Sequence, residues 1–205
     1  MTNELADLRE WKRRLSRLLD YTRQMSLRKD LDSLLGVVVD SAREILQAER
    51  CSVFILDKKK NELWSRVATG AQTIRVPADK GIVGQSISER RVINIPDAYA
   101  DKRFNPEVEH ASGFRTRSLL TAPLAKMRGE DIGALQVLNK KGGPFLEDDE
   151  KMFILFAEQA ASAVANAQLH DDLQAAYKDT IFRLAAAAEF KDHDTRLHLE
   201  RVSRS

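Results

Sequence analysis

The residues of this sequence that are best suited to chemistry are suited to binding rather than to catalysis. A GIVG stretch at residues 81–84 opens a segment whose pattern predicts a short helix over 82–89. Glycine allows close approach to the backbone, and the N–H groups at the start of a helix favour a negatively charged group. We therefore expect this turn to be able to hold a phosphate.

The sequence contains no residue set typical of a common catalytic mechanism. It has no Cys-x-x-Cys pair, no His-Glu-x-x-His motif and no Ser, His and Asp in an arrangement typical of a hydrolase. The single cysteine, Cys51, lies in an apolar segment, where a thiol is expected to be buried and inert. His110 and His170 are most simply surface residues. We predict that the chain is not an enzyme, requires no cofactor and holds no metal.

A charged pair is predicted at a corner between a strand and a helix. The apolar segment 131–138 ends just before Lys140, and a Gly-Gly-Pro turn at 142–144 precedes Phe145 and Asp149. Lys140 can reach Asp149 in the first turn of the following helix, while Phe145 fills the core at the bend. We expect a partly buried ion pair that fixes the angle between sheet and helix, although a chance pair on a surface turn is the alternative.

The elements that must position these residues are helices and short strands. Helices are predicted over 5–29, from Asp30 or Asp32 through Gln47, over 82–89, and from 149 to about 190. Strands are predicted over 51–57, 62–68, 73–76, 92–95, 118–126 and 131–139. Strands and helices do not alternate, so the expected class is α+β, a six-stranded antiparallel sheet flanked by helices.

Both terminal helices carry apolar stripes that predict a partner. In the first, spacings of three and four residues join Leu8, Trp11, Leu15, Leu18, Thr22 and Met25. That stripe can dock on the domain or pair with a second copy, and we favour a two-stranded coiled coil. The last helix carries a stripe of Leu169, Leu173, Tyr177, Ile181, Leu184 and Ala188. An amphipathic stripe must be buried, so we predict a homodimer.

Charge and hydropathy exclude several classes of partner. The chain has 205 residues, with 33 Lys and Arg against 31 Asp and Glu, and a net charge of +2. This balance argues against a dedicated nucleic-acid binder, which usually has a concentrated basic face. No apolar segment is long enough to span a membrane and no signal peptide opens the chain. We expect a cytoplasmic protein that contacts neither nucleic acid nor membrane.

The predicted corner resembles the signature of GAF domains from cyclic-nucleotide phosphodiesterases and adenylyl cyclases. The matching residues are Asn139, Lys140, Phe145, Asp149 and Glu150. Three further stretches resemble the same domains: RVPADKGIVG at 75–84, NIPDAY at 94–99 and GFRTR at 113–117. The resemblance covers about residues 31–170 and implies a GAF-like sheet in which the Lys–Asp pair is structural and does not touch ligand.

The resemblance also implies a ligand site for cyclic AMP or cyclic GMP. The implied ligand-binding residues are Ser52, Ile82, Val83, Asn105, Glu109, Ser112, Thr116 and Gln136. The backbone at 82–83 would hold the phosphate, and the loop 97–116 would close over the base. Gln136 and Asn105 depart from the carboxylate and the aromatic residue that the family leads us to expect, so Phe104 or Phe114 could stack instead. Another small ligand, or a ligand-free dimerisation module, is the alternative.

The end of the chain resembles the opening of an HD-GYP or HD-type phosphohydrolase domain. The matching segments are LAAAAE at 184–189, Lys191-Asp192, Thr195 and HLERV at 198–202. The resemblance implies that His198 is a metal ligand only in a full-length HD domain, and that the catalytic residues lie beyond the chain end. We expect residues 1–29 to form a coiled-coil helix, 30–170 a GAF sensory domain, 171–190 a signalling helix and 191–205 the start of the output domain. The expected function is to sense a small molecule and relay the signal to that output.

Overall fold

The computed structural model describes residues 2–28, 30–68, 75–106, 113–126 and 129–202. Residues up to Ala167 form one compact unit, and those from Gln168 onward form a second. The site predicted from the sequence lies in the first unit. The second unit consists, over its described residues, of the later part of one helix.

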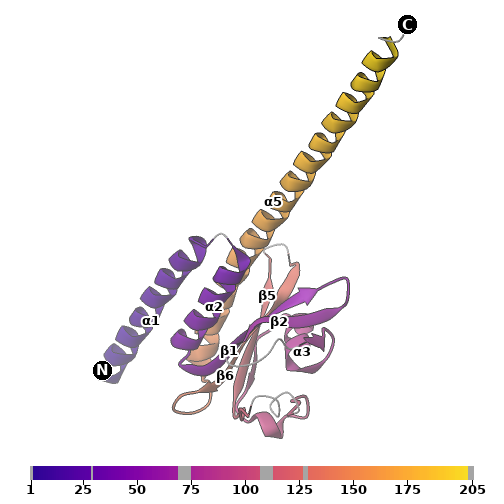
Figure 1. The fold of residues 1–205 in the computed structure, drawn as a ribbon. Helices are drawn as coiled ribbons and strands as arrows, with labels where there is room; N and C mark the ends of the chain where they lie inside the picture. Colours follow the sequence, from indigo (N-terminus) through magenta and orange to yellow (C-terminus); the bar gives the residue numbers. More distant parts are fainter. Residues whose placement is uncertain (1, 29, 69–74, 107–112, 127–128, 203–205) are drawn as a thin grey trace. The chain divides into compact units, whose positions relative to one another are not determined.

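A six-stranded sheet forms the centre of the first unit (Figure 1). Its strands are β1 (Ala48–Asp57), β2 (Glu62–Ala68), β3 (Arg75–Pro77), β4 (Ile93–Ile95), β5 (Leu119–Ala125) and β6 (Asp131–Lys140). They lie in the order β3-β2-β1-β6-β5-β4, and every neighbouring pair is antiparallel. The predicted α+β class with six antiparallel strands is confirmed.

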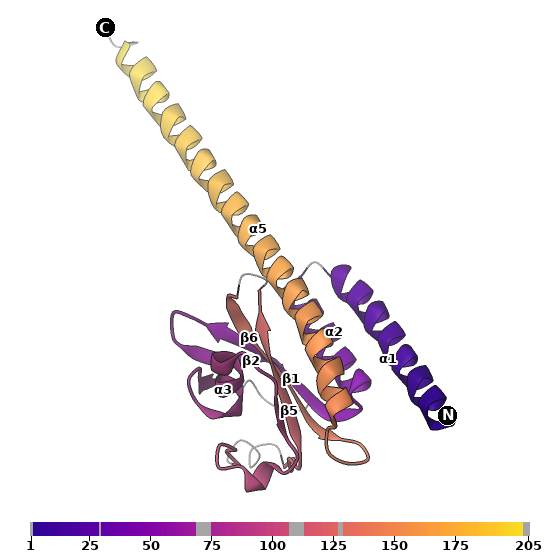
Figure 2. The ribbon, with the colours of Figure 1, turned by 180° about the vertical axis from the view of Figure 1, so that it is seen from behind.

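Helices cover both faces of this sheet (Figures 1 and 2). They are α1 (Thr2–Ser26), α2 (Leu31–Ile45), α3 (Gly81–Glu89), the 3₁₀ turn η1 (Ala98–Ala100) and α5 (Glu147–Val202). Asp30 is the N-cap of α2, because its carboxylate accepts a hydrogen bond from the Ser33 N–H at 2.8 Å. Of the two caps left open by the sequence, the structure therefore uses the first.

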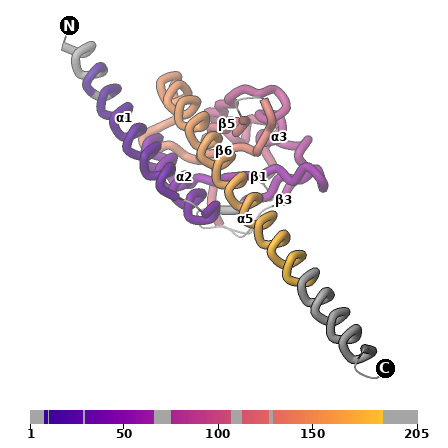
Figure 3. The backbone as a smooth tube through the Cα atoms, turned by 90° about the horizontal axis from the view of Figure 1, so that it is seen from above, coloured from indigo at the N-terminus to yellow at the C-terminus, as the bar shows by residue number. Residues whose placement is uncertain are grey.

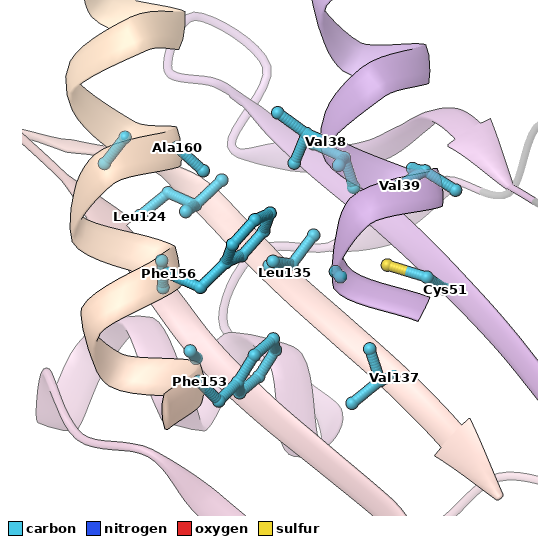
Figure 4. Packing of buried hydrophobic residues seen from close by; sticks show 14 of the residues in the cluster. Val38, Val39, Cys51, Leu124, Leu135, Val137, Phe153, Phe156 and Ala160 are labelled. Atoms are coloured by element: carbon cyan, nitrogen blue, oxygen red, sulfur yellow. The ribbon is translucent and has the colours of Figure 1, made fainter. Parts of the chain in front are cut away.

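The main core lies between one face of the sheet and the helices α2 and α5 (Figure 4). Phe153 and Phe156 from α5 meet Leu135 of β6 in that layer, and both rings are fully buried. Ala157, Ala160 and Ala161 are buried on the same helix, and their small side chains let it lie close to the strands. Burying each phenylalanine contributes about 1.5–3 kcal/mol, so this layer supplies much of the unit's stability.

The first helix packs on the domain through part of its apolar stripe. Leu18 and Met25 are buried in the main core, while Leu8 and Leu15 are exposed. α1 lies alongside α2 (Figure 3). Trp11 is partly buried against the same core, so docking on the domain accounts for three residues of the predicted stripe. A coiled coil through the exposed leucines stays a prediction.

The second unit exposes its apolar residues. All described side chains from Leu169 to Ala186 are exposed, including Leu173, Tyr177 and Ile181. Within the described ranges, no helix combines the length and the apolar character needed to cross a membrane. The predicted stripe is therefore exposed from Leu169 to Leu184 in the single chain, and the side chain of Ala188, its last member, lies outside those described.

Candidate functional site

The face of the sheet opposite the main core brings together two residues of the predicted site. Ser52 of β1 is paired with Gln136 of β6, which is in turn paired with Thr121 of β5. Directly opposed residues of antiparallel strands point to the same face. Phe54, two positions after Ser52, packs against α3, so this is the face that α3 covers. Ser52 and Gln136 are therefore neighbours on one surface.

Thr121 is a polar residue of this face that the sequence reasoning missed. The Gln136 side-chain amide donates a hydrogen bond to the Thr121 hydroxyl at 3.0 Å. Thr121 is fully buried and Gln136 is half-buried. Strand alternation could have placed Thr121 on this face. That step requires the register between β5 and β6, which the sequence does not give.

The start of α3 offers its backbone to this face. Gly81 has a φ of +69°, which glycine adopts without strain. At Gly84 a Cβ would lie 2.5 Å from the Ala78 carbonyl oxygen, so a side chain does not fit there. Lys80 stands at the N-cap without a side-chain hydrogen bond to the helix. The N–H groups at the start of a helix have no partner within it, and here no Lys80 side-chain bond caps them.

Ile82 and Val83, two of the predicted ligand residues, have buried side chains. The Ile82 side chain is buried against Ile93 and Leu119, and that of Val83 against Phe54 and Leu63. Each therefore anchors the helix to the sheet. A ligand contact through their main-chain atoms, which the resemblance implied, stays a prediction.

The predicted ligand residues of the loop 97–116 differ in burial. Thr116 is buried, with an exposed fraction of 3%, and Asn105 is exposed. Glu109 and Ser112 lie outside the described residues. The structure therefore brings Thr116 to the sheet but does not place Asn105 against it.

A cation that the sequence analysis did not consider lies on the face that carries Ser52, which we call the ligand face because the predicted ligand residues Ser52 and Gln136 lie on it. Arg50 of β1 precedes Ser52 by two positions, and its guanidinium carbon lies 3.9 Å from the centre of the Phe114 ring. Such a contact is a cation–π interaction. Nearby in the chain, Tyr99 and Phe104 have ring centres 5.4 Å apart. The face thus combines a positive charge, polar side chains and aromatic rings.

The predicted ion pair at the corner is present and extends to a third residue. Lys140 donates to the Asp149 carboxylate, whose side chain is only 1% exposed. The same carboxylate accepts from the Leu146 N–H at 2.8 Å, which caps the start of α5. Arg14 of α1 donates to its other oxygen at 3.1 Å. Asp149 therefore joins β6, the start of α5 and α1.

The remaining residues of the corner signature are also engaged. Phe145 is buried, and its carbonyl accepts from the Asn94 side chain at 2.9 Å. Glu150 accepts from the same side-chain nitrogen at 2.7 Å. Asn139 is buried, with a φ of +56°. Asn94 thus links Phe145 and Glu150 at the corner, and the expectation that the signature residues do not touch ligand stays a prediction.

Two titratable groups of β1 have shifted pKa values. Burial raises the pKa of the Cys51 thiol well above its ordinary value, so the sulfur stays protonated and unreactive. Hydrogen bonds from Asn139 and then Arg117 lower the pKa of Glu49, so its carboxylate stays ionised. Among the described residues, no cluster of His, Cys, Asp and Glu could hold a metal ion.

A separate groove lies on the other side of the sheet. Its volume is about 920 Å³, and it is lined by residues of α5 and β5 and by the segment 90–92. The basic residues there already have acidic neighbours: Arg91 pairs with Glu89 and Lys126 with Glu130. The sequence analysis did not predict this groove.

Comparison with known families matches the GAF domain to residues 30–164. A probable 3',5'-cyclic phosphodiesterase, pde-5, of Caenorhabditis elegans is 32% identical over 158 residues, which are 70% of this chain and 22% of that protein. The dual 3',5'-cyclic-AMP and -GMP phosphodiesterase 11A of Takifugu rubripes is 33% identical over 166 residues, 74% of this chain and 18% of that protein. The chain thus spans about a fifth of the length of these relatives.

Solved structures share the fold. The GAF domain of a phosphoenolpyruvate-protein phosphotransferase from Coxiella burnetii superposes with a TM-score of 0.70 at 24% identity, covering 79% of this chain and 98% of that one. A GAF domain/HD domain protein from Geobacter sulfurreducens superposes with a TM-score of 0.58 at 17% identity, covering 69% of this chain and 95% of that one. At these identities the likeness concerns the fold alone.

Proposed function

Because the chain belongs to the GAF domain family, we propose that it is a regulatory module that binds cyclic AMP or cyclic GMP on the sheet face covered by α3. The observation that carries the proposal is the register that sets Ser52 beside Gln136 on the same face as the first turn of α3. The relatives described above, which are cyclic-nucleotide phosphodiesterases by name, support this ligand class.

The groups on this face match the parts of a cyclic nucleotide. The phosphate carries one negative charge, which suits the N–H groups at the start of α3 and the guanidinium of Arg50. The base is flat with polar edges, which suits the Phe114 ring and the amide of Gln136. An amide both donates and accepts hydrogen bonds, so Gln136 can bind either adenine or guanine. Both nucleotides must therefore be tested.

The proposed output is a relay through the later part of α5. We propose that two chains pair along the exposed stripe from Leu169 to Leu184 and pass the ligand signal to a C-terminal HD-type phosphohydrolase domain. An exposed apolar stripe on a helix is unfavourable in water, which supports a partner. The alternative function is a dimerisation module that binds another ligand or none.

Titration calorimetry with each nucleotide tests the binding proposal. Arg50→Ala is expected to weaken binding at least tenfold, which corresponds to about 1.4 kcal/mol. Arg75→Ala is the matched control, because Arg75 is also a strand arginine and lies over a ring, with its guanidinium carbon 6.0 Å from the centre of Trp64. It should leave affinity unchanged.

Failure of the wild-type protein to bind either nucleotide at millimolar concentration would overturn the ligand assignment. Native mass spectrometry of freshly purified protein then separates the alternatives. A retained small molecule of another mass would indicate a different ligand. An empty dimer would indicate a dimerisation module.

A further inference from the structure

Asn139 holds the end of the proposed ligand loop through a single side chain. Its Oδ1 accepts hydrogen bonds from the N–H groups of Arg117, at 2.6 Å, and Ser118, at 3.3 Å. Its Nδ2 donates to the Arg115 carbonyl at 2.8 Å and to the Glu49 carboxylate at 2.9 Å. An asparagine side chain offers two donors and one acceptor oxygen, and all of them are used here.

The backbone of Asn139 explains why this residue can make these contacts. Its φ of +56° lies in the left-handed region, which asparagine adopts more readily than most residues. The Asn139 N–H still donates to the Ser118 carbonyl at 2.8 Å, so the strand pairing continues to this point. The side chain is therefore aimed back at the segment that leads into β5.

The two ends of the loop meet at this position. The Ala98 N–H, at the loop's start, donates to the Arg117 carbonyl at 2.8 Å. The Arg117 guanidinium also donates to Glu49 at 2.6 Å. Thr116, one of the predicted ligand residues, lies between Arg115 and Arg117, whose backbone groups both bond to Asn139. The loop's return end is thus bonded to its start, to β1 and to the end of β6.

We propose that Asn139 is the positioning residue for the ligand loop, fixing segment 115–118, and with it Thr116, against the ligand face. This inference rests on the proposed function only for the identity of the ligand. Lys140, the next residue, holds Asp149 at the start of α5. Consecutive residues therefore anchor the loop and the output helix, so a displacement of the loop's end acts within one residue of the helix anchor.

Amide hydrogen exchange tests the anchoring directly. Asn139→Gly retains the left-handed backbone and removes every side-chain bond. Asn61→Gly is the matched control, because Asn61 has a φ of +53° and is exposed in the turn between β1 and β2. The amides of Arg117 and Ser118 should exchange at least tenfold faster in the first variant and at the wild-type rate in the second. Unchanged exchange in folded Asn139→Gly would overturn the proposal.

A second variant keeps the test decisive if Asn139→Gly does not fold. Asn139→Asp retains an acceptor for the two amides but loses both donors and faces Glu49 with a second carboxylate. It should leave the Arg117 and Ser118 amides exchanging at close to the wild-type rate, while the backbone around Arg115, which loses the donor to its carbonyl, exchanges faster. Wild-type exchange rates throughout segment 115–118 in this variant would show that the Asn139 Nδ2 group does not hold the segment.

The affinity for cyclic AMP and cyclic GMP tests the consequence for the ligand. If the wild type binds either nucleotide, Asn139→Gly should weaken binding at least tenfold and Asn61→Gly should not. Loosened amides with unchanged affinity would overturn the positioning role. If the wild type binds neither, the proposed ligand fails, and hydrogen exchange alone decides whether Asn139 anchors the loop.

Discussion

At the scale of single residues, Asp149 is the group on which the corner depends. Its carboxylate is almost fully buried and accepts bonds from Lys140, Arg14 and the Leu146 N–H. A buried charge is tolerated only when it is paired and hydrogen-bonded. The resemblance implied the lysine partner, while the arginine comes from a helix outside the matched residues 30–164.

Removing the lysine is expected to destabilise the first unit measurably. Lys140→Ala leaves a buried carboxylate with one cationic partner fewer, and should lower the free energy of unfolding by about 2–4 kcal/mol. Lys141→Ala changes an exposed neighbour and should cost about 0.5 kcal/mol or less. Urea denaturation of the two variants checks this. Equal midpoints for both would show that the ion pair contributes nothing.

Glu49 is expected to make stability depend on pH. Its pKa is lowered from the ordinary 4.5, first by the bond from Asn139 and then by Arg117. The stabilisation is therefore complete above pH about 4.5 and is lost as the pH falls through the lowered value. The side chain is one-third exposed, so the effect should be below about 1 kcal/mol. Wild type should exceed Glu49→Gln in stability at pH 7, and a difference that does not shrink as the pH is lowered further and further below 4.5 contradicts this assignment.

At the scale of elements, α1 is part of the folded unit. It is attached by Arg14 to the corner and by Leu18 and Met25 to the main core. A helix bound in this way is held by tertiary packing rather than by its own propensity. Any change that displaces α1 therefore acts on the residue that caps α5.

Adjacent leucines on α1 allow a sharp test of this docking. Leu18 has an exposed fraction of 5% and Leu19 one of 64%. Leu18→Ala should cost about 2–4 kcal/mol of unfolding free energy, because it removes buried methyl groups from the core. Leu19→Ala should cost about 0.5 kcal/mol or less. Denaturation at low protein concentration measures both, and similar losses for the two variants would show that α1 does not dock on this face.

At the scale of the whole molecule, the proposed relay through α5 depends on pairing of two chains. The exposed residues Leu169, Leu173 and Tyr177 lie in the second unit, where nothing in the described chain covers them. Leu173→Glu should convert a dimer to a monomer, since it places a charge in the proposed seam. Gln174→Glu adds the same charge to the neighbouring residue and should leave the dimer intact. Light scattering after gel filtration measures the mass, and a monomeric wild type at micromolar concentration would refute the pairing.

The ligand is expected to change the distance between the paired helices. A packed seam moves between discrete arrangements, and a ligand biases them only by its differential affinity, typically about 1–3 kcal/mol. Spin labels near the exposed residue Lys178 report this distance with and without cyclic AMP or cyclic GMP. A nucleotide that binds tightly and leaves the distance distribution unchanged would exclude the relay.

The sequence by itself determined the local features of this protein. Alternating apolar residues, turn residues and helical stripes predicted the strands, the fold class and the corner, because those signals depend on neighbours in the chain. The Lys140–Asp149 pair could be predicted because a short turn joins its two residues. The resemblance added the ligand face, including Ser52 and Gln136, by position alone.

The tertiary structure decided which distant residues meet. Arg14 and Asp149 are separated by 135 positions, and Asn139 holds a loop that precedes it by a whole strand. Arg50 became a candidate ligand residue only when Phe114 was found over its guanidinium. An apolar stripe also does not specify its partner. Only the buried side chains of Leu18 and Met25 show that α1 packs on the main core. Such contacts depend on strand register and helix docking, which are set by the whole folded unit rather than by any local pattern.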